Sequence, residues 1–203
     1  DTGWGNHLMI ERTIKSMIQA GAAAVHIEDQ PFAKRCGHRK GKKIITTVEM
    51  VERIQAAVEA RGSSSEIVIM ARTDAFASEG MQGAIDRALA YIDAGADMIF
   101  PEALTSLEEY AVFKNAVKSP ILANITEFGQ TPLFTTKELS SVGVEMALYP
   151  LSANRAMNLA ALRTLEEIRH HGTQKHLLET MQTREELYGF LNYEKYEQTL
   201  GTS

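Results

Sequence analysis

The segment Ala20-Gly21-Ala22-Ala23-Ala24-Val25-His26-Ile27-Glu28-Asp29 decides the fold class, because a glycine leads into a short apolar run that ends in two carboxylates. The same theme returns where Gly95 precedes the run 98–102 and where Gly143 precedes the run 146–150. Glycine commonly ends a helix, and a short apolar run bounded in this way is typical of a buried strand. The repeat therefore predicts helices that alternate with parallel strands in an α/β fold.

Two further apolar runs, 67–71 and 121–123, raise the expected number of strands to five. The segments between strands begin like helices, because a threonine is followed three residues later by a glutamate, as in the capping box. These pairs are Thr46 and Glu49, Thr105 and Glu108, Thr135 and Glu138, and Thr183 and Glu186. Apolar side chains at helical spacing are expected to face the core. They are Val51, Ile54 and Val58 on one helix, and Met81, Ile85, Leu89 and Ile92 on another.

Length and composition limit the class of protein. The 203 residues are 44% hydrophobic with a net charge of -5, which is typical of a soluble domain. No apolar run approaches the roughly 18 residues of a membrane-spanning helix. The single cysteine excludes a disulfide framework and favours a reducing compartment. Neither glycine-rich nucleotide loop, GxGxxG or GxxxxGK followed by Ser or Thr, occurs. The chain starts at Asp1 rather than methionine, so it is either processed or a piece of a longer protein.

Five strand and helix units fit a doubly wound sheet or part of a (β/α)8 barrel of the TIM type. Length alone favours the doubly wound sheet, because a complete barrel takes about 250 residues. The positions of the polar residues favour the barrel, because they follow the ends of four predicted strands. These residues are Glu28 and Asp29, Arg72 and Asp74, Glu102, and Asn124 and Thr126.

The carboxyl ends of parallel strands meet at one mouth, where the active sites of such folds lie. Carboxylates beside an arginine suit a hard divalent cation such as Mg²⁺. Asp1, which precedes a glycine turn, is expected to face the same mouth. For any single one of these residues, a helix cap or a structural ion pair is an equally good interpretation. Zinc is disfavoured, because Cys36 and His38 are the only close pair of histidine and cysteine ligands.

Residues 34–43 hold six basic side chains and no acidic one. Such a run fits a nucleic-acid patch. It lacks aromatic residues, however, and the rest of the chain is strongly acidic, so we expect no nucleic-acid partner. Cys36 by itself would be an ordinary core residue. Because Lys34, Arg35 and His38 would stabilise its thiolate, the sequence favours a reactive thiol on a lid over the mouth.

The motif Lys34-Arg35-Cys36-Gly37-His38 resembles the signature of the carbon-carbon lyases in the isocitrate lyase and phosphoenolpyruvate mutase superfamily. Within that superfamily, the chain resembles the methylisocitrate lyases at residues 124–129 with 131–134, and at residues 148–152 with 155–158. Residues 181–188 resemble the C-terminal segment of the same group. The resemblance extends over essentially the whole chain and implies the barrel fold.

The resemblance implies a Mg²⁺-dependent retro-aldol cleavage of 2-methylisocitrate, a small tricarboxylate, to pyruvate and succinate in the methylcitrate cycle of propionate breakdown. It implies that Asp1 and Glu28 bind the metal, that Cys36 donates a proton to the succinate carbanion, and that His38 tunes this thiol. The residues that match substrate-contacting positions are Cys36, Gly37, Arg72, Glu102, Asn124, Ile125, Thr126, Arg155 and Arg184. The alternatives are isocitrate lyase, a lyase for another 2-oxo or malate-type acid, and a catalytically incomplete fragment.

The resemblance also implies that the first three barrel strands, a substrate-binding loop and another metal-site aspartate lie upstream of Asp1. We therefore expect a single domain with a partial barrel over 1–171 and a helical tail over 172–203. Members of this group exchange their last helix within a homo-oligomer, a tetramer. We expect a cytoplasmic protein with no membrane partner, or a mitochondrial one if an upstream segment targets it there.

Overall fold

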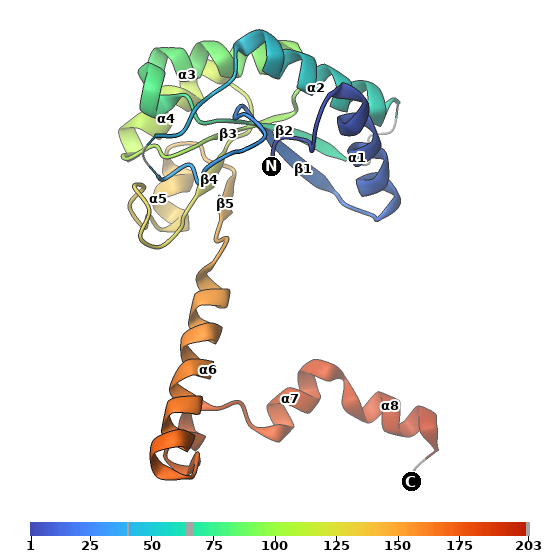
Figure 1. Cartoon of the computed structure of the whole chain (residues 1–203), viewed down its shortest axis with the longest axis vertical. Coiled ribbons are helices and arrows are strands. Elements are labelled where there is room, and N and C mark those ends of the chain that lie inside the picture. Colours follow the sequence, from blue (N-terminus) through green and yellow to red (C-terminus); the bar gives the residue numbers. More distant parts are fainter. Residues whose placement is uncertain (40, 64–66, 202–203) are drawn as a thin grey trace. The chain divides into compact units, whose positions relative to one another are not determined.

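The computed structural model describes residues 1–39, 41–63 and 67–201 (Figure 1). Lys40, which belongs to the basic run, lies outside the described residues. The chain forms two compact units, Asp1–Ser152 and Ala153–Ser203. Each unit is described by itself below. Across the described residues, we find no helix with the length and apolar character needed to cross a membrane.

Helices and strands alternate through the first unit, as the glycine theme predicts. In chain order they are α1 (His7–Gln19), β1 (Ala24–Glu28), α2 (Thr47–Arg61), β2 (Val68–Thr73), α3 (Phe76–Asp93), β3 (Met98–Pro101), α4 (Leu107–Val117), β4 (Leu122–Asn124), α5 (Thr136–Ser141) and β5 (Met146–Leu148). Gly21, Gly95 and Gly143 precede β1, β3 and β5 with φ values of 78°, 103° and 85°. Glycine adopts this left-handed conformation at little cost, so each of the three ends a helix as predicted.

The strands are parallel, and their order in space follows their order in the chain. β1 pairs with β2, β2 with β3, and β4 with β5, while a parallel bridge between Ile99 and Ile121 connects β3 to the start of β4. A doubly wound sheet reverses its strand order at a switch point, whereas a (β/α)8 barrel wall does not. The prediction of a parallel α/β fold is confirmed, the strand order agrees with the wall of a barrel, and the closure of eight strands stays a prediction.

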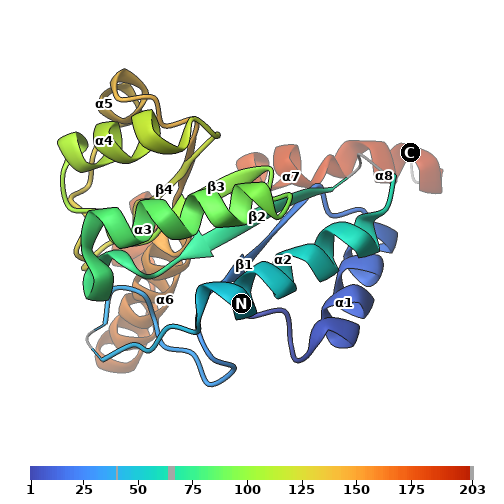
Figure 2. The same ribbon diagram turned by 90° about the horizontal axis from the view of Figure 1, so that it is seen from above.

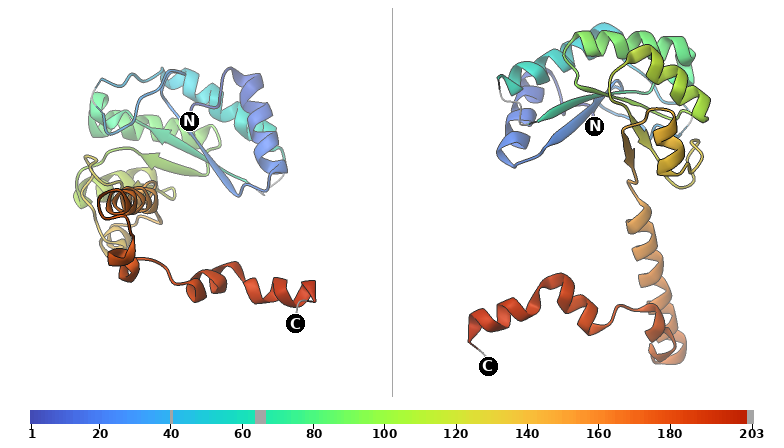
Figure 3. Two further views of the ribbon diagram at one scale, coloured as in Figure 1. Left: turned by 60° about the horizontal axis from the view of Figure 1, so that its bottom comes forward. Right: turned by 180° about the vertical axis from the view of Figure 1, so that it is seen from behind.

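Helices α1 to α4 lie over one face of β1, β2 and β3 (Figure 1, Figure 2). Figure 3 shows the same layer of helices from behind. Consecutive helices contact each other, and the space between helices and strands is filled mainly by aliphatic side chains, among them Ile10, Ile14, Ile54, Ile69 and Ile99. Burial of apolar surface at roughly 25 cal/mol per Å² is the main stabilising contribution of such a core. The carboxyl ends of the strands, in contrast, carry polar residues.

Three of the four predicted capping boxes are present, at Thr46, Thr135 and Thr183. The fourth prediction is wrong by one residue, because α4 is capped by Ser106 with Glu109. Thr105 instead donates its hydroxyl to Glu109 Oε2 at 3.0 Å. Either hydroxyl has a glutamate three residues later, so the sequence pattern alone does not distinguish them.

One predicted core position is also wrong. Leu89 of α3 is 40% exposed, whereas Ile85 is buried on the same helix. The buried face of α3 includes Arg87 and Tyr91, so the apolar pattern misplaced one edge of this face. On α2, Ile54 is buried and its predicted neighbours Val51 and Val58 pack against the core, as expected.

The second unit contains α6, which begins at the boundary residue (Ser152–His171), the 3-10 helix η1 (Lys175–Thr180), α7 (Arg184–Leu191) and α8 (Tyr193–Leu200). No residue of these four elements is buried. Their apolar side chains therefore contribute little to a core of their own. The predicted division into a barrel to residue 171 and a tail beyond it stays a prediction.

Candidate active site

Arg72 lies at the centre of a buried ionic cluster at the strand ends. The register places Glu28 of β1 opposite Arg72 of β2. The Arg72 Nε atom is 3.0 Å from Asp74 Oδ2 and 3.4 Å from Glu28 Oε2, and its Nη2 atom is 3.5 Å from Glu102 Oε1. Burial acts to lower the pKa of Arg72, but the three carboxylates raise it above its ordinary value. Burial likewise acts to raise the pKa of Asp74, and the adjacent cations hold it below its ordinary value. Arg72 and Asp74 are therefore charged near neutral pH.

His38 is fixed between two different segments. The Gln130 N–H donates to its Nδ1 atom at 3.0 Å, so in the neutral ring Nε2 carries the proton. This Nε2 atom is 3.1 Å from Glu102 Oε1 and 3.4 Å from Asn124 Nδ2. Burial acts to raise the pKa of Glu102, but the hydrogen bond from His38 and the charge of Arg72 hold it below its ordinary value. His38 therefore orients Glu102.

The contacts of His38 can be compared with the prediction that it tunes the Cys36 thiol. Both ring nitrogens of His38 already have partners, and Cys36 is exposed. The predicted tuning of the thiol by His38 stays a prediction. In the structure, His38 contacts Glu102 and the segment around Gln130.

The basic run belongs to a loop over residues 30–45, which we call the thiol loop. Lys34 Nζ lies 3.0 Å from Glu28 Oε1, and Lys42 Nζ donates to Asp74 Oδ1 at 3.0 Å. Two of the six basic side chains thus pair with buried carboxylates of the strand ends. The loop is held across the mouth by these contacts, which is where the sequence predicts a lid.

Gly37 is a buried residue of the thiol loop. Lys42 Nζ donates to its carbonyl oxygen at 2.7 Å. A Cβ at this position would lie 2.5 Å from Arg72 Nη2 and closer still to Cγ and Oε1 of Glu102. Only glycine allows the loop to approach the cluster this closely. Cys36 precedes this glycine in the chain and is exposed.

Asp1 and Glu28 are neighbours, because the Glu28 N–H donates to the Asp1 carbonyl oxygen at 3.0 Å. Glu28 is fully buried, and its Oε1 accepts no hydrogen bond from the described residues, although Lys34 Nζ is close enough for an ion pair. Three carboxylates at these strand ends, those of Glu28, Asp74 and Glu102, contact the cationic side chains of Arg72, Lys34 and Lys42. A buried carboxylate with an unsatisfied oxygen, next to the aspartate at position 1, fits Mg²⁺, whose remaining ligands are commonly water and substrate oxygens.

Asp29, unlike Glu28, does not face the mouth. Its Oδ2 accepts from the Thr73 hydroxyl at 2.7 Å and the Tyr91 hydroxyl at 2.9 Å, and its Oδ1 accepts from the Asp74 N–H at 2.8 Å. Burial raises the pKa of Asp29 despite these hydrogen bonds. Asp29 therefore has a structural role, because its hydrogen bond to the Asp74 N–H fixes the backbone that positions the Asp74 side chain.

Sequence analysis missed the residues that anchor the ends of the thiol loop. Arg87 Nη1 donates to the Ile45 carbonyl oxygen at 2.9 Å, while its Nε and Nη2 donate to Glu79 at 2.7 and 2.8 Å. At the other end, Arg53 Nη1 donates to the Gln30 carbonyl oxygen at 2.8 Å. An arginine within the apolar face of α3 was the available signal, since a buried charge requires partners.

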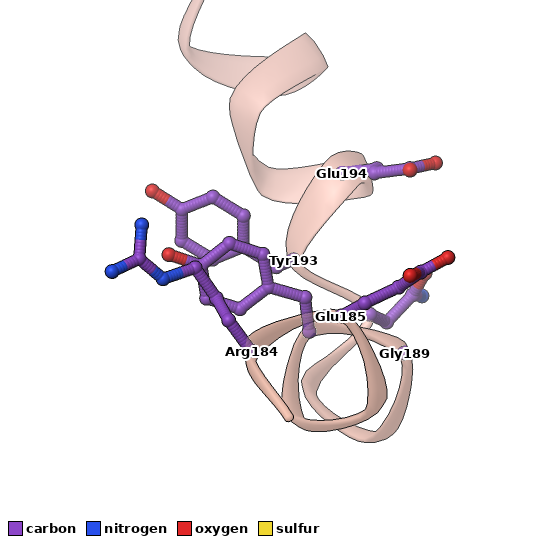
Figure 4. A pocket seen from close by; sticks show the side chains of 7 residues that line it. Arg184, Glu185, Gly189, Tyr193 and Glu194 are labelled. Carbon is purple, nitrogen blue, oxygen red and sulfur yellow. The ribbon is translucent and has the colours of Figure 1, made fainter. Parts of the chain in front are cut away.

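The remaining predicted substrate residues fall into two groups. Ile125 and Thr126 are buried just after β4, beside Asn124, whose Oδ1 has no hydrogen-bond partner among the described residues. Arg155 lies near the start of α6 and Arg184 begins α7, both in the second unit. Within that unit, Arg184 lines a hollow of about 590 Å³ and extends beside Tyr193 (Figure 4). Tyr193 stacks on Tyr188 with ring centroids 4.3 Å apart.

The chain is similar to known proteins in both sequence and fold. Residues 1–169 match the profile of the phosphoenolpyruvate phosphomutase family. A curated 2-methylisocitrate lyase of Escherichia coli (strain K12) is 59% identical over 201 residues, which are 98% of this chain and 68% of that enzyme.

Two solved structures extend this comparison. A 2,3-dimethylmalate lyase, described as a member of the PEP mutase/isocitrate lyase superfamily, superimposes with a TM-score of 0.88 at 34% identity, over 99% of this chain and 68% of that one. A phosphonopyruvate hydrolase in complex with oxalate and Mg²⁺ superimposes with a TM-score of 0.82 at 25% identity, over 98% of this chain and 69% of that one. Since the family profile covers most of the chain and both the sequence and the fold agree with it, the chain belongs to the phosphoenolpyruvate phosphomutase family, within the PEP mutase/isocitrate lyase superfamily.

Proposed function

We propose that this chain forms the catalytic part of a carbon-carbon lyase that cleaves 2-methylisocitrate to pyruvate and succinate. The observation that supports it most is the packing of Gly37 onto Glu102 and Arg72, because the residue next to Gly37 in the chain is Cys36, whose thiol is exposed. The 59% identity to a curated 2-methylisocitrate lyase supports the choice of substrate.

The reaction is a retro-aldol cleavage. A general base takes the proton of the tertiary hydroxyl, and the oxygen electrons form the carbonyl of pyruvate, while the electron pair of the breaking carbon-carbon bond stays on the succinate carbon. The Cys36 thiol donates a proton to that carbon and becomes a thiolate, which solvent then reprotonates. General acid catalysis of this kind contributes typically 10² to 10⁴ in rate.

The strand-end residues bind and orient the substrate. Asn124 offers an unpaired carbonyl oxygen to a substrate donor, and Ile125 and Thr126 line the same edge. Arg72 places a permanent positive charge beneath the thiol loop, and His38 keeps Glu102 in place. By resemblance, Arg155 and Arg184 bind substrate carboxylates, for which the guanidinium fork is well suited.

Asp1 and Glu28 are the residues that we propose to hold Mg²⁺. When bound there, the metal ion would stabilise the negative charge that develops on the oxygen atoms of the pyruvate half. It would also add positive charge at the strand ends, which favours a trianionic substrate. The phosphonopyruvate hydrolase structure with Mg²⁺ and oxalate supports this choice of metal.

The cellular setting follows from the same proposal. We place the enzyme in the methylcitrate cycle of propionate breakdown, in the cytoplasm, and expect a homotetramer. Sedimentation of the full-length protein tests the oligomeric state, and a dimer or monomer would contradict it.

The substrate is tested by measuring pyruvate release from the full-length protein with a panel of 2-methylisocitrate, isocitrate and 2,3-dimethylmalate. We expect the highest kcat/KM with 2-methylisocitrate, and activity that requires Mg²⁺. Equal or better cleavage of either competitor would overturn the substrate assignment, and turnover in the presence of a chelator would overturn the metal assignment.

A further inference from the structure

A group of side chains that could hold a metal ion lies in the second unit, at the end of α6 and in η1. Glu167, His171 and His176 each offer one ligand atom, and the three atoms lie within 4.8 Å of one another. His176 Nδ1 is 2.6 Å from Glu167 Oε1, and His171 Nδ1 is 3.8 Å from the same oxygen. Among the described residues, no other group of three such side chains meets this criterion.

The local backbone structure brings the three side chains together at the end of α6. Glu167 and His171 are four residues apart on α6, so they lie on the same face of the helix. Gly172 then turns the chain with a φ of 67°, while its N–H donates to the Ile168 carbonyl oxygen at 2.8 Å. This turn leads into η1, where His176 comes back over the last turn of α6.

The donor set selects the class of metal. Two imidazole nitrogens and one carboxylate oxygen suit Zn²⁺ and neighbouring first-row transition metals, whereas Mg²⁺ prefers oxygen ligands. Glu167 is the anchor, because its side chain is 19% exposed while those of the two histidines are 47% and 55% exposed. The histidine rings lie nearly perpendicular with centroids 5.8 Å apart. Because both rings are exposed, they have room to rotate toward a shared ion, and a zinc site would hold each nitrogen at roughly 2.0 Å.

We propose that Glu167, His171 and His176 form a binding site for a divalent transition metal of the Zn²⁺ class. The site offers three protein ligands and leaves a fourth position to water or to another molecule. Its bound metal links the end of α6 to η1 and so stabilises the turn at Gly172. The proposal is independent of the lyase activity, because none of the three residues takes part in it.

Calorimetric titration of the full chain with Zn²⁺ alone tests the site. The Cys36→Ser variant is used as the background, with excess Mg²⁺ present, so that neither the thiol nor the strand-end carboxylates compete. We expect one equivalent of Zn²⁺ to bind, and His176→Ala and Glu167→Gln each to weaken the binding about tenfold or more. The matched control is His170→Ala, because His170 is adjacent but its Nδ1 contacts the Glu166 carbonyl oxygen instead. This control should bind Zn²⁺ like the background.

Titration with Co²⁺ provides a second readout. Visible absorption bands of a site with nitrogen and oxygen ligands should appear in the background protein and in His170→Ala, and they should vanish in His171→Ala. Circular dichroism checks that each variant is folded. Absence of stoichiometric binding, or equal losses for His170→Ala and His176→Ala, would overturn the proposal.

Discussion

Replacement of Gly37 by alanine tests how closely the thiol loop must approach the ionic cluster. In the structure, the added Cβ would lie 2.5 Å from Arg72 Nη2 and even nearer to two atoms of Glu102. Ordinary contacts are 3.5 to 4.0 Å. At least about 1 Å of clearance must therefore come from movement of the loop or of the charged pair beneath it.

Either movement breaks a specific contact. If Glu102 moves, its 3.1 Å contact with His38 is lost, and if the loop rises, the 3.0 Å contacts of Lys34 with Glu28 and of Lys42 with Asp74 are lost. Overpacking costs typically 1 to 3 kcal/mol, and we expect Gly37→Ala to lower the free energy of unfolding by about that amount. A misplacement of about 1 Å costs on the order of 10² in rate, so we expect kcat to fall by about 100-fold because Cys36 moves with the loop.

The assay combines urea denaturation with pyruvate release by the full-length protein. Gly189→Ala in α7 is the matched control, because a Cβ there meets no heavy atom within 4 Å. We expect this control to keep normal turnover and to gain about 0.5 to 1 kcal/mol from helix propensity.

Two results would refute the reasoning. Normal stability and turnover in Gly37→Ala would mean that the loop does not pack on Glu102 and Arg72 as described. A loss of stability with unchanged kcat would mean that the packing is structural only and does not position the thiol.

Four further outcomes are expected. Cys36→Ser should lower kcat by about 10² to 10⁴ while substrate binding, measured calorimetrically, is retained; an unchanged rate would exclude Cys36 as the proton donor. Arg87→Met should lower the free energy of unfolding by about 2 to 3 kcal/mol because it loses buried hydrogen bonds, whereas Glu79→Gln should cost less than about 1 kcal/mol; equal losses in urea denaturation would contradict the buried contacts to Ile45. Burial and nearby positive charges lower the pKa of His26 to about 4. The unfolded chain therefore binds an extra proton between about pH 6.5 and 4, and stability should fall by up to about 3 kcal/mol as the pH drops through that window; His26→Asn should remove this component, and an unchanged pH profile in thermal melts would contradict it. Chelation should abolish turnover and added Mg²⁺ should restore it, and activity that survives chelation would argue against Asp1 and Glu28 as metal ligands.

Much of the fold was predictable from local patterns. The three glycines before β1, β3 and β5 were identified as helix stops, because helix termination depends on the backbone conformation of one residue. The capping boxes at Thr46 and Thr135 were equally local. The error at Thr105 arose because two adjacent hydroxyl residues satisfy the same pattern.

The candidate site was predictable in its residue types but not in its contacts. Strand ends of a parallel sheet converge, so Glu28, Arg72, Glu102 and Asn124 could be placed together from the sequence. The sequence could not show whether each side chain faces the mouth or the core. The structural role of Asp29 is visible only from its hydrogen bonds with Thr73, Tyr91 and Asp74.

By itself, the sequence determined the parallel α/β class, the number of strands and the identity of the thiol loop, because these depend on periodicity and on neighbours along the chain. Tertiary structure decided that Gly37 lies against Glu102, that Gln130 orients His38, and that Arg87 anchors the loop at Ile45. These contacts join residues dozens of positions apart. Their existence depends on how helices and strands pack in space, which no local pattern records.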